Sequence, residues 1–314
     1  MNIVRVPRSI QTIAIVLLPA CARPQTGTAP VRFALPAGTE LVEGSSGRPV
    51  ATSALLNRVS QSDYALLGEV HDNPIDHEVR AGIIDALASV HPAIVFEQFG
   101  ASDAPIPPPP PPARASGDHL EAWLDSNGFD RKGWKWPLHR PVVLAAIAHA
   151  RSLWGANVSR EALTPVVMAG GSERAVPDSL RQLVNQAPLG DAARAVLDSE
   201  LVEGHCHELP NEMIPGMRMA QIVRDAAMAR ALQLAGRDGP AWLIAGNGHV
   251  RNDVAVPRLL RAAVPNARVV TLGILEREED GGPPQASERR MYDFVVITPR
   301  AQRPDPCAEL RRPR

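Results

Sequence analysis

The sequence has few aromatic residues, few cysteines and no surplus of positive charge. Phenylalanine, tryptophan and tyrosine make up 4% of its 314 residues, and there are 3 cysteines. Its 33 basic side chains oppose 34 acidic ones, for a formal net charge of −1. Proteins that bind nucleic acid need a surplus of Lys and Arg to neutralise phosphates. We therefore predict no nucleic-acid partner.

Short metal-binding and haem-attachment motifs are also missing. The sequence contains no CxxC, HExxH or CxxCH spacing, and the absence of CxxCH excludes covalently attached c-type haem. The segment His205-Cys206-His207 has ligand residue types, but the side chains of adjacent residues diverge. We interpret this segment as structural and predict no metal site.

The first 21 residues have the features of an export signal. Arg5 and Arg8 precede an apolar stretch at residues 10–18, which is too short to span a bilayer. Leu18-Pro19-Ala20-Cys21 resembles a lipobox, which would put a lipid on Cys21 and anchor the chain to the membrane. Ala20-Cys21-Ala22 is also a small-x-small cleavage site. We predict a signal peptide over 1–21 and a place in the cell envelope, as an outer-membrane lipoprotein or, if Cys21 is not lipidated, in the periplasm.

The remaining chain divides by composition. Residues 22–60 are rich in Pro, Gly, Ser and Thr and predict a linker or a packed arm, with a short apolar pattern at 31–35 typical of an edge strand. Residues 61–300 predict one domain, and 301–314 a polar tail. Six consecutive prolines at 107–112 end a predicted insertion at 105–112, an exposed polyproline II loop. An oxidising compartment would permit a disulfide between Cys206 and Cys307, but one buried and one exposed thiol is an equal alternative.

Short apolar runs without alternation are typical of strands buried on both faces. The stretches 75–90, 118–126 and 217–234 have helical spacing, and Gly236 closes the last of them. Alternation of such runs with helices predicts an α/β fold, a mainly parallel open sheet flanked by helices. The runs lie at residues 64–68, 93–96, 165–168, 241–245, 268–275 and 292–297.

Polar residues follow several of these runs directly. Gly68-Glu69-Val70-His71 follows the first, Glu97 the second, and Gly246-Asn247-Gly248-His249 the run at 241–245. In open α/β sheets ligands bind at the carboxyl ends of the strands. We therefore predict one site that contains Glu69, His71, Glu97 and His249. Two glycines in the last turn permit positive φ angles and a close approach of ligand to backbone.

Two further groups of side chains are candidates for this site. Trp134, Trp136 and His139 form an aromatic cluster that suits stacking on a flat ligand, or ordinary packing. On the helix at 217–234, the spacing of Gln221, Asp225 and Met228 places them on one face, which could look toward the site.

Together these segments resemble the ChaN family of haem-binding lipoproteins, within the wider Tiki and erythromycin-esterase-like superfamily. The resemblance implies an α/β fold, non-covalent haem binding linked to iron uptake, and a homodimer that encloses haem. The sequence departs from the family in its polyproline insertion and in His139, which stands where we expect a tyrosine. The matching stretches are Leu67-Gly-Glu-Val-His-Asp-Asn-Pro74, Phe96-Glu-Gln98, Trp134-Lys-Trp-Pro137, Gln221-Ile-Val-Arg-Asp-Ala-Ala-Met-Ala229 and Gly246-Asn-Gly-His-Val-Arg-Asn-Asp-Val-Ala-Val-Pro257.

Two functions follow as hypotheses. In the first, an envelope protein binds haem for iron acquisition, with His71, His139 or His249 as axial ligand and Arg251 as a partner for the propionates. In the alternative, the chain is a hydrolase: His71 is the general base, oriented by Glu69, and Glu97 and His249 lie at the reacting centre. The residues leave open whether the chain is an enzyme.

Overall fold

A computed structural model describes residues 33–110, 117–305 and 307–308. The predicted signal peptide with Cys21, the first two residues of the segment at 31–35, and the last two prolines of the run at 107–112 lie outside these ranges. The described residues form a seven-stranded sheet in the order β1-β7-β6-β2-β5-β3-β4. Its strands are β1 (Glu40–Glu43), β2 (Tyr64–Leu67), β3 (Ala93–Gly100), β4 (Ser152–Asn157), β5 (Ala241–Ile244), β6 (Val269–Glu276) and β7 (Phe294–Thr298).

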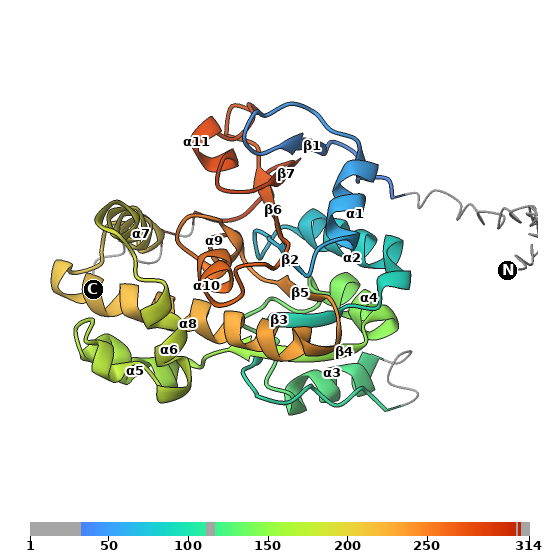
Figure 1. The fold of residues 1–314 in the computed structure, drawn as a ribbon. Coiled ribbons are helices and arrows are strands. Elements are labelled where there is room, and N and C mark those ends of the chain that lie inside the picture. Colours follow the sequence, from blue (N-terminus) through green and yellow to red (C-terminus); the bar gives the residue numbers. More distant parts are fainter. Residues whose placement is uncertain (1–32, 111–116, 306, 309–314) are drawn as a thin grey trace, which may run out of the picture. The chain divides into compact units, whose positions relative to one another are not determined.

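The sheet is mainly parallel and open, as predicted. β1 pairs with β7 in the antiparallel sense, and every other neighbouring pair is parallel. Helices cover both faces (Figure 1). They are α1 (Thr52–Ser60), α2 (Pro74–Ala86), α3 (Gly117–Ser126), α4 (Arg140–His149), α5 (Arg160–Met168), α6 (Asp178–Gln186), α7 (Asp191–Gly204), α8 (Ile214–Ala235), α9 (Asn247–Val250), α10 (Val256–Ala263) and α11 (Ala286–Arg289).

Two apolar layers sandwich the sheet, because successive side chains of a strand point to opposite faces. In β2, Ala65 and Leu67 belong to the layer under α1, α2, α3 and α4. Tyr64 and Leu66 belong to the layer under α5, α6, α7, α8 and α10. Burial on both sides explains why the strand sequences are unalternating.

The register of the central strands brings three chain segments to the same edge. Leu67 of β2 pairs with Ile244 of β5, and Ile244 pairs with Phe96 of β3. The residues that follow these three positions therefore emerge side by side at the carboxyl end of the sheet. This is the edge at which the sequence places the site.

One strand assignment from the sequence is wrong, and the strand β4 was missed. The apolar run at 165–168 is the end of helix α5, which begins where the Ser159 hydroxyl accepts a hydrogen bond from the Ala162 amide. Because this N-cap lies before the apolar run, the four residues of the run considered alone have the pattern of a buried strand. The strand β4 was not predicted, because Ser-Leu-Trp-Gly-Ala-Asn has neither β-branched residues nor alternation.

The predicted helices at 118–126 and 217–234 are confirmed, and the helix predicted over 75–90 ends earlier than expected. The stretch 75–90 forms α2 and a 3-10 turn at Ala88–Val90, and the stretch 118–126 lies within α3. The stretch 217–234 lies within α8, and Gly236 is the residue that caps it. Asn73 caps α2, because its side chain accepts a hydrogen bond from the Ile75 amide.

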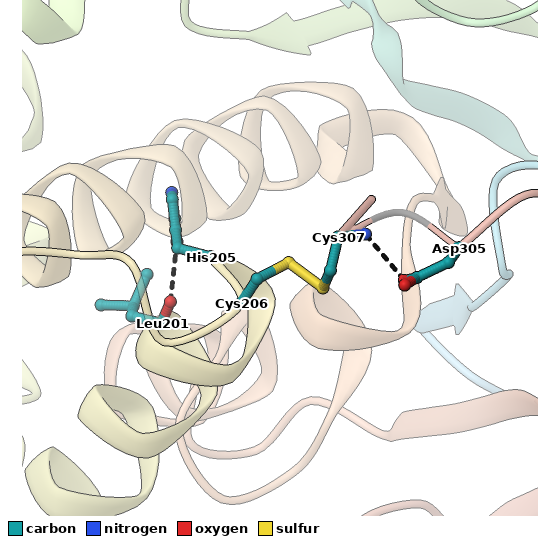
Figure 2. Close-up of a disulfide and its surroundings, with 5 residues drawn as sticks. All are labelled: Leu201, His205, Cys206, Asp305 and Cys307. Carbon is teal, nitrogen blue, oxygen red and sulfur yellow. Dashed lines mark hydrogen bonds between the residues drawn. A yellow bond between two sulfur atoms is a disulfide. The ribbon is translucent and has the colours of Figure 1, made fainter. Parts of the chain in front are cut away.

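The segments outside the predicted domain also pack onto it. Residues 33–60 contain β1 and α1. The described part of the predicted edge strand, residues 33–35, is not a strand, and β1 at Glu40–Glu43 was not predicted. Near the C-terminus, Cys307 forms a disulfide with Cys206, with the two Cα atoms 5.6 Å apart (Figure 2). Among the described helices, none has the length and apolarity that crossing a membrane requires.

Candidate functional site

The structure brings the four predicted residues Glu69, His71, Glu97 and His249 together. The Gly246 amide donates a hydrogen bond of 2.8 Å to Glu97 Oε2, and His249 Nε2 lies 3.3 Å from Glu97 Oε1. His71 lies against the same glycine, and its Nδ1 is 2.6 Å from Glu69 Oε1. Two polar clusters, one around Glu69 and one around His249, thus meet at His71 and Gly246.

Glu69 is the centre of the first cluster and is 2% exposed. Its Oε1 faces His71 Nδ1 at 2.6 Å, the Gln98 amide nitrogen at 3.0 Å and His139 Nε2 at 3.3 Å. Its Oε2 forms an ion pair with Arg80, which is fully buried. A buried carboxylate is costly unless it is paired, and Arg80 provides that pairing.

His77 joins this cluster as an acceptor from Arg80. The Arg80 guanidinium donates to His77 Nδ1 at 2.6 Å, so the proton of the neutral ring lies on Nε2. Nε2–H then donates to the His71 carbonyl at 3.1 Å, which fixes the backbone of the Gly-Glu-Val-His turn. Burial lowers the pKa of His77 to about 4 and keeps it neutral. Arg80 and His77 therefore support the turn that carries His71.

His71 is the exposed histidine of the site. Its side chain is 44% exposed, whereas His139 is fully buried and His249 is 7% exposed. Desolvation lowers the pKa of His71, although the carboxylate of Glu97 opposes this shift. Trp134 packs edge-on against His71 with the ring centroids 4.9 Å apart. His71 is thus a largely neutral imidazole at the surface, oriented by a carboxylate.

The second cluster holds His249 between two carboxylates. Nδ1 lies 2.6 Å from Asp225 Oδ1 of α8, while Nε2 faces Glu97. Burial alone would lower the pKa of His249, but Glu97 and the hydrogen bond with Asp225 raise it to about 10. Burial likewise works against ionisation of Glu97, but the charge of His249 lowers its pKa to about 2. At neutral pH these two residues form a buried ion pair.

The face of α8 that was expected to look toward the site does so in part. Gln221 has its side-chain amide 3.3 Å from His249 Nδ1, and Asp225 binds the same nitrogen. Met228 instead lies in the apolar layer. Within the aromatic group, His139 is in the Glu69 cluster, and its ring centroid is 5.9 Å from that of Trp134.

Gly246 allows a close approach of the His71 side chain, rather than of a ligand as predicted, and it does so without a positive φ. It caps α9 with φ −62° and ψ 153°, an extended conformation that any residue adopts. A Cβ at this position would lie 2.9 Å from both Cε1 and Nε2 of His71. A Cβ at Gly248 would meet nothing within 4 Å. The required glycine is therefore Gly246, because its missing side chain makes room for His71.

Within the described part of the chain, the contacts of Arg251 are with residues outside the two clusters. It is 3% exposed and is paired with Glu200 of α7 and with Asp253. A cation nearer to His71 is Lys135, which is 60% exposed and binds Asp72, the residue after His71, at 3.0 Å. Arg303 binds the same carboxylate at 2.9 Å.

Sequence reasoning missed His77 and Arg80, which lie on α2 and complete the shell of Glu69. Their signal is weak, because His and Arg three residues apart on a helix are ordinary surface residues. A second signal was available: Glu69 follows a buried strand, and a buried carboxylate needs a cation as its partner.

Comparisons with known proteins agree with this architecture. Residues 55–260 match the family model described as haem-binding uptake, Tiki superfamily, ChaN. A structure of ChaN from Campylobacter jejuni, described as binding haem cofacially, has a TM-score of 0.64 at 17% identity, over 82% of this chain and 96% of that one. No protein of curated function matches the sequence.

Two more distant structures have TM-scores below 0.5. The type III effector HopBA1 has a TM-score of 0.41 at 12% identity, over 79% of this chain and 92% of that one. The erythromycin esterase EreC, in an open conformation, has a TM-score of 0.39 at 16% identity, over 84% of this chain and 83% of that one. The family model, which spans about two thirds of the sequence, decides the assignment: this chain belongs to the ChaN family of haem-binding uptake proteins in the Tiki superfamily.

Proposed function

We propose that this chain binds haem non-covalently and serves haem or iron uptake in the cell envelope. The observation that carries the proposal is the exposed imidazole of His71 in a chain of this family. Haem needs an axial His, Tyr or Met and cations for its propionates. Of the three histidines predicted as axial ligands, only His71 has an exposed ring.

The residues around His71 suit this role. Glu69 accepts a hydrogen bond from Nδ1 and so leaves Nε2 as the nitrogen for iron, an arrangement that orients the ring and raises its basicity. The absent side chain of Gly246 allows the ring of His71 to lie against the backbone of the turn in this orientation. Trp134 offers an aromatic edge, and we assign the propionate contact to Lys135, which is 60% exposed, rather than to Arg251, which is buried.

A surface imidazole covers only one face of haem, and we propose that a second copy of the chain covers the other. An envelope location suits both this role and the disulfide between Cys206 and Cys307, because disulfides persist in oxidising compartments. Lipidation of Cys21 would hold the protein at the membrane. Replacing Cys21 with Ser should move it from the membrane fraction to the soluble periplasmic fraction, and a wild-type protein already soluble there would contradict the anchor.

Haemin titration of the purified, tag-free chain tests the main proposal. We expect a saturable Soret shift in the wild type, an affinity at least ~10-fold lower in His71→Ala, and an unchanged titration in His207→Ala, an exposed histidine outside the site. Sedimentation with and without haemin reports whether haem joins two chains. A spectrum identical to that of free haemin would overturn the proposal.

The hydrolase alternative rests on the same His71–Glu69 pair. An imidazole oriented by a carboxylate, with a lowered pKa and an exposed ring, has the properties of a general base. A panel of chromogenic esters assayed with wild type and His71→Ala separates the two functions. Hydrolysis that disappears in the variant would support catalysis, and a rate equal to that of buffer would remove it.

A further inference from the structure

We propose that Glu69, His71 and His139 form a binding site for one divalent transition-metal ion, of the zinc or cobalt type. Each residue offers one ligand atom, and the three atoms lie within 4.8 Å of one another. Two imidazoles and one carboxylate are a common set for catalytic zinc, in which a water or substrate takes the open position. The candidate atoms are Glu69 Oε1, His71 Nδ1 and His139 Nε2.

The geometry needs only a small adjustment to accept an ion. Bonds of about 2.0–2.2 Å in a tetrahedral site separate neighbouring ligand atoms by about 3.3 Å. His139 Nε2 already lies 3.3 Å from Glu69 Oε1. His71 Nδ1, at 2.6 Å from Glu69 Oε1, must move away by about 0.7 Å to reach this separation, and its ring has room to do so because its side chain is 44% exposed.

The hydrogen bonds of His139 also point to a cation. A neutral imidazole carries one proton. If that proton lies on Nε2, toward Glu69, the buried Nδ1 has no hydrogen-bond partner among the described residues. If it lies on Nδ1, the Nε2 lone pair faces a carboxylate oxygen of Glu69. In this second arrangement, a metal ion between His139 Nε2 and Glu69 Oε1 would bind both atoms and remove the repulsion between the lone pair and the carboxylate.

The charged side chains around the site offset one another, so a dication would meet no net positive charge. Glu69 and Glu97 supply two negative charges, and Arg80 and His249 supply two positive ones. Arg80 binds Oε2 of Glu69 and leaves Oε1 for the ion. The site uses Nδ1 of His71, whereas the proposed haem ligand is Nε2, so the metal proposal does not rest on haem binding.

Cobalt titration of the haem-free, tag-free full chain tests the site. We expect one Co²⁺ per chain, with the strong visible bands of four-coordinate cobalt, and displacement of Co²⁺ by Zn²⁺. His139→Phe and His71→Ala should each weaken Co²⁺ binding by at least ~10-fold. His207→Ala should bind as the wild type does, which also tests whether the His-Cys-His segment is the ligand.

His71→Ala keeps the test decisive if His139→Phe fails to fold, because the His71 ring is partly exposed. Absence of stoichiometric cobalt binding, or equal affinity in wild type and His71→Ala, would overturn the proposal. Loss of binding in His207→Ala would do the same. The readout contains no haem, so failure of the haemin titration leaves this result unaffected.

Discussion

His249 shows at the residue scale how two carboxylates set the charge of a buried ring. Its folded pKa of about 10 lies above the ordinary value of 6.5, so its contribution to stability is full below pH 6.5 and is lost as pH rises through 10. We expect the difference in free energy of unfolding between wild type and His249→Asn to shrink from pH 7 to pH 10. Urea denaturation at several pH values measures it.

The exposed His207 provides the control for this experiment, because His207→Asn removes an imidazole outside the ion pair. A His249→Asn difference that stays constant from pH 7 to pH 10 would show that the ring is not protonated in the folded state. At acid pH, the pKa shift of Glu97 gives the opposite dependence of stability on pH. Its depressed pKa of about 2 means that its contribution is present above pH 4.5 and is lost as pH falls through 2.

At the scale of elements, the turn from β5 into α9 decides where His71 stands. Gly246→Ala would place a methyl group 2.9 Å from the His71 ring and push the ring outward. We expect this variant to lower haem affinity by about 10-fold, because small displacements of a ligand residue are costly. Gly248→Ala is the matched control two residues away, since its Cβ has free space. Equal affinities in the two variants would remove the role assigned to Gly246.

The same turn shows what the sequence could and could not predict. Parallel strands with aligned ends make the convergence of Glu69, Glu97 and His249 predictable, because apolar runs followed by polar residues mark those ends. The reason for the glycine was not predictable, because it depends on His71 from a different strand end. Likewise, the ion pair of Glu69 with Arg80 depends on how α2 lies over the sheet, and no local pattern encodes that.

At the scale of the whole domain, the segment before Cys307 connects the site to the disulfide. Arg303 binds Glu276 of β6 at 2.7 Å and Asp72 beside His71 at 2.9 Å. The side-chain amide of Asn73 donates a hydrogen bond to the Pro299 carbonyl at 3.0 Å. The polar tail predicted from residue 301 onward is therefore, in its described part, a segment that packs against the N-terminus of α2. Four residues after Arg303, the disulfide of Cys307 with Cys206 attaches this segment to the domain a second time.

Removing this crosslink should loosen both the domain and the site. The disulfide joins residues 101 positions apart, and the loss of such a long closed loop costs about 2–5 kcal/mol of unfolding free energy. We expect the double variant Cys206→Ser, Cys307→Ser to unfold at a lower urea concentration, in line with this loss of unfolding free energy. A reductant should lower the urea midpoint of the wild type by the same amount. The double variant should not respond to reductant. Because Arg303 holds Asp72 next to His71, haemin affinity should fall as well, and an unchanged Soret titration in the double variant would show that the tail does not support the site.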